Sequence, residues 1–133
     1  MANKSKKILS EISAGELLDK ISILEIKLEK IYDKNKQVEL KKEYKILEEN
    51  QNSTIKLEGK IKDLFKSLKN INLKLWNVED KLRICEKNKD FGQTFVDLSR
   101  SVYLNNDKRA NIKSEINKIL GSNIREIKQY ANY

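Results

Sequence analysis

The fold is decided by the stretch from Leu57 to Cys85, which reads LEGKIKDLFKSLKNINLKLWNVEDKLRIC. Its apolar residues recur at alternating steps of four and three, so they share one side of an α-helix. At 1.5 Å per residue the resulting stripe is about 42 Å long. The stripe consists of Leu57, Ile61, Leu64, Leu68, Ile71, Leu75, Val78, Leu82 and Cys85. Phe65, Leu73, Trp76 and Ile84 widen this apolar face, which indicates that the helix contacts more than one neighbour.

A second long helix is predicted directly after this one. Residues 88–92 supply a turn in which Asp90 is the predicted N-cap. The stripe that follows has coiled-coil-like spacing and consists of Phe91, Phe95, Leu98, Val102, Asn105, Arg109, Ile112, Ile116 and Ile119. Because the turn is short, we expect the two helices to form an antiparallel hairpin.

The N-terminal part of the chain predicts two further helices. Ser13 and Glu16 form a capping box that starts a helix ending near Tyr32, and we expect this helix to pack along the hairpin. A more polar helix follows, carrying Leu40, Tyr44 and Leu47. The turn-forming residues 50–53 predict a break before the long stretch begins.

Gly121 is the predicted stop of the last long helix, and Ser122 is the predicted cap of a short final helix with Ile124 and Ile127. The chain contains no proline, so nothing obliges the long helices to break. We therefore predict an all-α fold, an antiparallel helical bundle built on a long helical hairpin. Residues 13–133 are expected to form one domain, preceded by an extended segment over residues 1–12.

Composition narrows the functional classes. Histidine is absent, which removes the commonest general base, and the single cysteine, Cys85, allows no intrachain disulfide. We find no secretory signal and no apolar run of roughly 20 residues, so we expect a cytoplasmic protein without a membrane partner. The net charge of +8 is spread along the chain and comes mostly from lysine. Nucleic-acid binding therefore ranks below other functions.

Two polar residues interrupt the apolar stripe of the last long helix, Asn105 and Arg109. An unpaired guanidinium in the core is costly, so a partner is expected. Counting outward from the turn places Arg109 near Ile71 and Asn72. The same register places Glu79 and Asp80 near Arg100, and Arg83 near Asp97.

These arginines define the candidate site. It comprises Arg83, Arg100, Arg109, Trp76, Glu79, Asp80, Tyr103, Asn105, Asn106 and Asp107, with Glu16, Asp19 and Lys20 as additions from the first helix. One interpretation is an anion-binding pocket between helices, since arginine is rare here and offers a planar set of donors. The other, which we favour, is a network of ion pairs that fixes the register of the helices. No residue is predicted to be catalytic or to bind a metal or cofactor.

Several short motifs in a fixed order resemble one family. They are ELLDK (16–20), ILEIK (23–27), LW (75–76), VED (78–80), DFG (90–92), RSVY (100–103), ND (106–107), RA (109–110) and GS (121–122). The chain resembles domain of unknown function family 6165 from about Glu11 to Tyr130, although residues 34–70 match only in length and helical character. The resemblance implies a compact helical bacterial or phage protein and supplies no catalytic residue.

Two hypotheses for the function follow. The first is a noncatalytic helical interaction module that binds a protein partner or self-associates. The alternative is a small enzyme or sensor that binds an anionic metabolite at the arginine cluster, a chemistry that needs no histidine.

Overall fold

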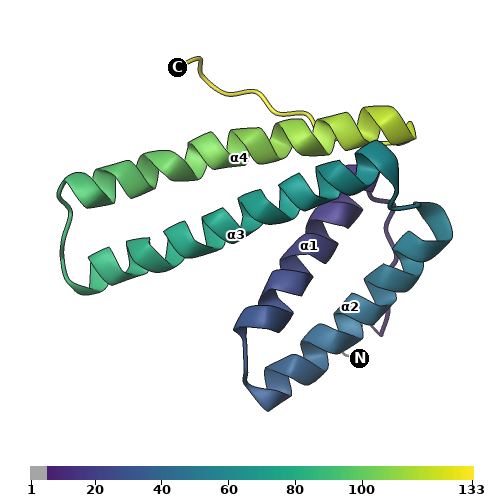
Figure 1. The fold of residues 1–133 in the computed structure, drawn as a ribbon, viewed down its shortest axis with the longest axis horizontal. Coiled ribbons are helices and arrows are strands. Elements are labelled where there is room, and N and C mark those ends of the chain that lie inside the picture. Colours follow the sequence, from purple (N-terminus) through teal and green to yellow (C-terminus); the bar gives the residue numbers. More distant parts are fainter. Residues whose placement is uncertain (1–5) are drawn as a thin grey trace, which may run out of the picture.

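The computed structural model of the chain describes residues 6–133 and contains four helices and no strand within that range (Figure 1). They are α1 (Ala14–Lys30), α2 (Lys34–Thr54), α3 (Gly59–Lys87) and α4 (Gln93–Leu120). The predicted all-α bundle built on a long hairpin is confirmed. The predicted extended segment is described only over residues 6–12, which carry no helix, and residues 1–5 lie outside the described part.

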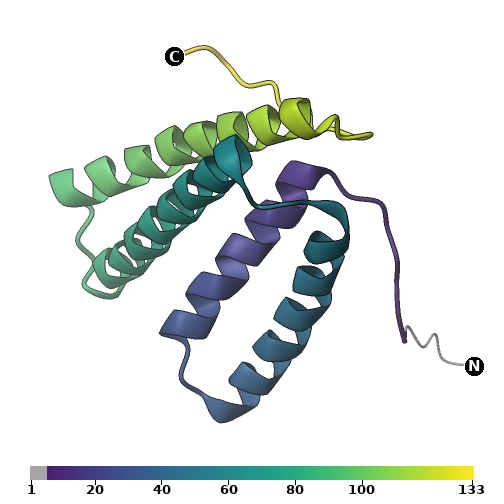
Figure 2. The ribbon, with the colours of Figure 1, turned by 45° about the vertical axis from the view of Figure 1, so that its right-hand side comes forward.

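The four helices form two hairpins that share α1. Helix α1 packs against α2, α3 and α4, whereas α2 packs against α1 alone. In Figures 1 and 2, α1 crosses the α3–α4 hairpin obliquely near one end of that hairpin, and the opposite end, with the turn, projects beyond α1. We call this projecting part, residues 73–107, the arm. The arm is a pair of helices without a third helix packed along its length.

The core lies where α1 crosses the hairpin. Its fully buried apolar side chains include Leu18 and Ile26 from α1, Leu68 from α3 and Ile116 from α4. Tyr44 and Leu47 of α2, which are partly buried, pack against the cluster formed by the buried residues. The hydrophobic stripes predicted from sequence therefore do meet, but they meet at a crossing and not along parallel helices.

The N-terminus of α1 is held against the end of α4. As predicted, Ser13 is the N-cap, and its hydroxyl accepts from Glu16 N–H at 3.1 Å. Asn117 Oδ1 accepts from Gly15 N–H at 2.7 Å, and Ser122 Oγ accepts from Ala14 N–H at 3.1 Å. Three N–H groups that a helix start leaves unpaired are thus satisfied, two of them by residues a hundred positions away.

Gly15 allows this close contact between α1 and α4. A Cβ atom at this position would lie 2.6 Å from the Lys113 carbonyl oxygen and 3.0 Å from Asn117 Oδ1. Backbone atoms cannot yield as a flexible side chain does, so any larger residue forces the two helices apart.

The structure corrects several predicted helix ends. Helix α2 runs through residues 50–53 to Thr54, because the hydroxyls of Ser53 and Thr54 donate back to the Asn50 carbonyl within the last turn. The break comes instead at residues 55–58. Helix α1 stops at Lys30, two residues before the predicted end. Asp90 is not the N-cap of α4. The N-cap of α4 is Gly92, whose N–H donates to Asp90 Oδ1 at 3.2 Å.

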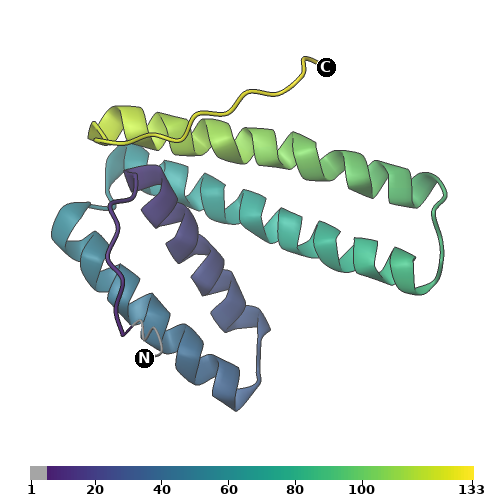
Figure 3. The same cartoon turned by 180° about the vertical axis from the view of Figure 1, so that it is seen from behind.

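The C-terminal segment also differs from the prediction. Gly121 ends α4 in the left-handed conformation, as expected, but residues 122–133 form no helix and run back along α4 (Figure 3). Ser122 caps α1 instead of starting a final helix, and Ile124 and Ile127 are exposed, so no apolar face stabilises a helix there.

Candidate functional site

Asp19 is the centre of a charged network between α1, α3 and α4. Its carboxylate is 1% exposed and accepts two hydrogen bonds from Arg109, one from Nε to Oδ1 at 2.9 Å and a very short one from Nη2 to Oδ2. Asn72 Nδ2 donates to the same Oδ1 at 2.8 Å and also to Ser22 Oγ at 2.8 Å. Asp19 thus connects all three helices of the crossing.

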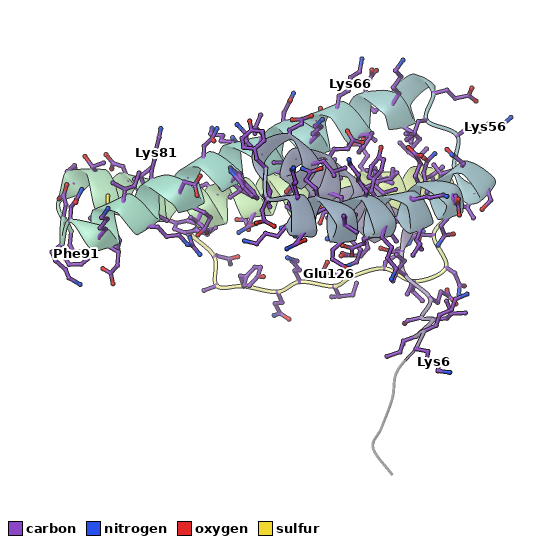
Figure 4. All side chains as sticks on the ribbon, turned by 90° about the horizontal axis from the view of Figure 1, so that it is seen from below. Lys6, Lys56, Lys66, Lys81, Phe91 and Glu126 are labelled. Carbon is purple, nitrogen blue, oxygen red and sulfur yellow. The ribbon has the colours of Figure 1, made fainter. Side chains whose placement is uncertain are left out.

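A second cation completes the network. Lys113 Nζ lies 3.6 Å from Asp19 Oδ2 and 2.7 Å from Glu16 Oε2. It also lies 3.4 Å from Glu126 Oε2, a carboxylate of the C-terminal segment that is labelled in Figure 4. The Lys113 side chain is only 11% exposed, so these carboxylates supply its charge compensation.

The local sequence explains why these groups meet. Glu16 and Asp19 are three residues apart on α1, and Arg109 and Lys113 are four apart on α4, so each pair shares one helix face. The N-terminal half of α1 lies across both long helices, which brings the two acids onto the two cations. Ser22, one turn after Asp19, donates to the Asp19 carbonyl and orients its Oγ to accept from Asn72.

The electrostatics of the network favour the charged forms. Burial by itself raises the pKa of Asp19, but the hydrogen bonds from Arg109 and Asn72 and the nearby positive charges bring it below the ordinary 3.8. The hydrogen bonds to Asp19 raise the pKa of Arg109. Burial lowers the pKa of Lys113, yet the adjacent carboxylates outweigh it and raise the pKa overall.

The buried polar groups of the network are all paired within the protein. Every buried side-chain nitrogen and oxygen within residues 6–133 has a hydrogen-bond partner. Over the same residues, no three His, Cys, Asp or Glu side chains are arranged to hold a metal ion. The Asp19 carboxylate is 1% exposed and is held by a guanidinium, an amide and an ammonium, so this geometry suits a structural clamp.

Beside the network lies a cleft of about 440 Å³ between α1, α3 and α4. Its apolar wall comes from both α1 and α3, and its polar rim includes one edge of the network. The lining residues are Ile23, Ile26, Asn72, Leu75, Trp76, Glu79, Asp80, Arg83, Asn106 and Arg109. Arg109 is 28% exposed, so part of its guanidinium faces this cleft while the rest binds Asp19.

The structure brings some of the predicted site residues together and separates the others. The cleft brings together Trp76, Glu79, Asp80, Arg83, Asn106 and Arg109, and the network adds Glu16 and Asp19. Lys20 is exposed and lies 3.9 Å from Glu16 on its own helix. Arg100 is exposed and lies neither in the cleft nor in the network.

Tyr103 and Asp107 lie under the C-terminal segment. The Tyr133 hydroxyl donates to Asp107, and the Tyr133 ring packs edge-on against Tyr103 with centroids 5.5 Å apart. Asn105 is buried, and its Nδ2 donates to the Ser101 carbonyl at 2.7 Å. It therefore satisfies its polar group within α4.

Two predicted charge pairings differ from the structure. Arg83 pairs with Glu79 on its own helix, with Nη1 and Oε2 2.7 Å apart, and the partner of Asp97 is Gln93. Both are contacts four residues apart on one helix, which need less ordering than pairing across the hairpin. Arg109 and Asn72, predicted to be neighbours, do bind the same Asp19 oxygen.

Sequence reasoning missed several members of the network, namely Ser22, Asn72 as a donor, Lys113 and Glu126. It also missed Asn117, which accepts from the Gly15 N–H at the start of α1. One signal was available for Lys113. It follows Arg109 by four residues and so lies on the same inward face, opposite the Glu16 and Asp19 pair of α1. Asn117 follows Lys113 by a further four residues and so offered the same signal, whereas Glu126, in the segment after α4, offered none.

The fold and the site together define a small all-helical protein in which a buried ion-pair network joins a short helix to a long helical hairpin. The chain belongs to the family of unknown function DUF6165, whose model matches residues 8–133. Neither the curated proteins nor the solved structures gave a match. Over residues 6–133 no helix has both the length and the apolar composition required to cross a bilayer.

Proposed function

We propose that the protein is a noncatalytic helical interaction module that binds a protein partner at the cleft beside Trp76. The observation that carries this proposal is a difference between the ion-pair network and the cleft beside it. The charged groups of the network satisfy one another, whereas the adjoining cleft is open and presents apolar side chains beside charged ones. Protein interfaces are built in this way, with an aromatic anchor site inside a polar rim.

The cleft has the composition of a recognition surface for a partner helix. Ile23, Ile26, Leu75 and Trp76 offer an apolar wall, and the volume of about 440 Å³ suits one or two large side chains. Its arginines already have carboxylate partners, Glu79 for Arg83 and Asp19 for Arg109, while Asp80 lies on the rim. This balance favours a partner that brings apolar and basic side chains together.

A small enzyme or sensor for an anionic metabolite is the second candidate, because Arg83 and Arg109 both line the cleft. The paired carboxylates weaken this second candidate, since they neutralise the positive charge that would attract an anion.

Nucleic-acid binding ranks third. Lys62, Lys66 and Lys69 share one face of α3, but Lys69 is held by Glu25 and Glu29 at 3.0 and 2.9 Å. A cytoplasmic location is part of the proposal and rests on the single, free cysteine.

The only tryptophan of the chain, Trp76, reports on the cleft directly. We would titrate the protein with an alanine-based amphipathic helical peptide carrying one phenylalanine and two lysines, and separately with citrate, ATP and a short DNA duplex. We expect the peptide to cause a saturable blue shift of the tryptophan emission. Trp76→Phe, measured by its competition with the wild type for the peptide, should bind the peptide at least tenfold more weakly. A response to citrate or ATP alone, lost in Arg109→Lys, contradicts the module and supports the metabolite site.

A further inference from the structure

The outward face of α3 in the arm carries a self-complementary pattern. Val78 and Cys85 are buried in the seam with α4. On the other side of the helix, Trp76, Asp80, Ile84 and Lys87 follow one another at steps of four, four and three. Ile84 is 57% exposed, and in residues 6–133 neither Asp80 nor Lys87 has an ion-pair partner.

The arm also ends in an exposed aromatic side chain. Phe91 is 50% exposed at the turn between α3 and α4, where Figure 4 shows it at the tip of the molecule. Lys87 and Lys89 flank it in sequence. The tip is therefore aromatic and basic, whereas the cleft at the base of the same helix face is apolar, with Asp80 and Glu79 on its rim.

We propose that two copies of this chain pair their arms antiparallel, with the tip of each arm seated at the Trp76 cleft of the other. This inference rests on the proposed function, because it names a second copy as the protein partner. A two-fold axis between residues 83 and 84 of α3 brings Asp80 opposite Lys87 of the other copy, and it brings Trp76 to the turn of the other copy, which carries Phe91. The register that pairs the opposite charges thus also brings an aromatic side chain of each copy to the Trp76 cleft of the other, and both contacts occur twice.

The centre of the pairing is compatible with this register. Ile84 lies next to the axis and gains the apolar contact that it lacks in one copy. Arg83 also lies there, but its Glu79 partner 2.7 Å away on the same helix neutralises it. From Trp76 to Lys87, where α3 ends, the contact runs for about 16 Å at 1.5 Å per residue, and the turn that carries Phe91 extends it.

The charge distribution favours self-association at the arm over other surfaces. The whole chain carries +8, so two copies repel each other on average. The arm, residues 73–107, holds six basic and six acidic side chains and has no net charge. The arm is thus the long surface on which two copies meet without like-charge repulsion, and its complementary charges fix the direction of pairing.

Sedimentation equilibrium between 2 and 500 µM tests the proposal. For the wild type we expect the mass to rise from 15.6 kDa toward twice that value. Asp80→Lys and Lys87→Asp each place like charges opposite one another, and each should weaken association at least tenfold. An equimolar mixture of the two variants restores opposite charges at both contacts and should recover the wild-type mass. Lys81→Asp, the same change about 120° around the helix from Lys87, is the matched control and should associate like wild type.

Circular dichroism melts verify that the variants are folded, and the recovery in the mixture is itself evidence that both are. A wild type that remains at 15.6 kDa up to 500 µM overturns the dimer, as does a mixture that stays monomeric. The proposed function is judged separately, by the peptide titration at Trp76. A monomer that still binds the peptide refutes only the second copy as partner, and a monomer that does not bind it refutes the module as well.

Discussion

Replacing Asp19 by asparagine tests whether the buried network holds the fold. The change keeps the shape of the side chain but turns Oδ2, which accepts from Arg109, into a donor that faces another donor. One charge-assisted hydrogen bond is lost, a loss of about 1.5–3 kcal/mol, and the positive charges of Arg109 and Lys113 lose their shared partner. Complete burial of an unpaired charge would cost about 3–5 kcal/mol.

Two features reduce this cost of burying an unpaired charge. Arg109 is 28% exposed and can be hydrated, and Lys113 keeps Glu16 at 2.7 Å and Glu126 at 3.4 Å. We therefore expect Asp19→Asn to lower the free energy of unfolding by about 3 kcal/mol, which for a chain of this length shifts Tm by about 12 °C.

Urea and thermal unfolding followed by circular dichroism at pH 7 measure this loss. Asp63→Asn is the matched control, because Asp63 is exposed on α3 and should change stability by less than about 0.5 kcal/mol. Adding Arg109→Met to Asp19→Asn removes the stranded guanidinium, so the double variant should be less destabilised than the sum of the single changes. A loss below about 1 kcal/mol for Asp19→Asn, or strict additivity with Arg109→Met, would refute the reasoning.

Three other predictions follow from the same crossing. Gly15→Ala should destabilise by about 1–3 kcal/mol in urea unfolding, since its Cβ meets a carbonyl oxygen at 2.6 Å. Gly92→Ala, whose Cβ has its nearest atom at 3.4 Å, should lose only the preference of an N-cap for glycine, less than about 1 kcal/mol. Ser122→Ala should cost about 1 kcal/mol by removing a cap of α1, and the exposed Ser114→Ala, measured in parallel, should not. Because the pKa of Asp19 is lowered, its contribution is present above pH 3.8 and is lost as the pH falls through the folded-state pKa. Acid titration of stability should therefore be less steep in Asp19→Asn, and equal slopes would contradict this.

Much of the fold follows from spacing alone. The stripe from Leu57 to Cys85, the stripe from Phe91 to Ile119 and the capping box at Ser13 predict three of the four helices closely, because periodicity and caps are local signals. Helix ends were less predictable where side chains bond within a turn, as Thr54 does with Asn50. Ser122 is instructive, because it has the chemistry of a cap, as predicted, but the helix it caps is α1.

The site was only partly predictable, for a physical reason. The sequence shows that Arg109, on an apolar stripe, needs a partner, but several acidic residues could pair with it. Which of them does so depends on the angle at which α1 crosses the hairpin. That angle depends in turn on Gly15, where the absence of a Cβ lets α1 approach the Lys113 backbone. Asp19 becomes the partner of Arg109 only once this contact has formed.

The network and the cleft are therefore two consequences of one crossing. If α1 lay parallel to the hairpin, its C-terminal half would cover the arm and complete a conventional bundle. The bonds of Asp19 to Arg109 and Asn72 fasten α1 near its start, and its remaining length diverges from α3, so that Ile23 and Ile26 form one wall of the cleft opposite Trp76. A buried ion network whose members depend on one another, and which specifies one arrangement of helices, suits a protein whose binding surface depends on that arrangement.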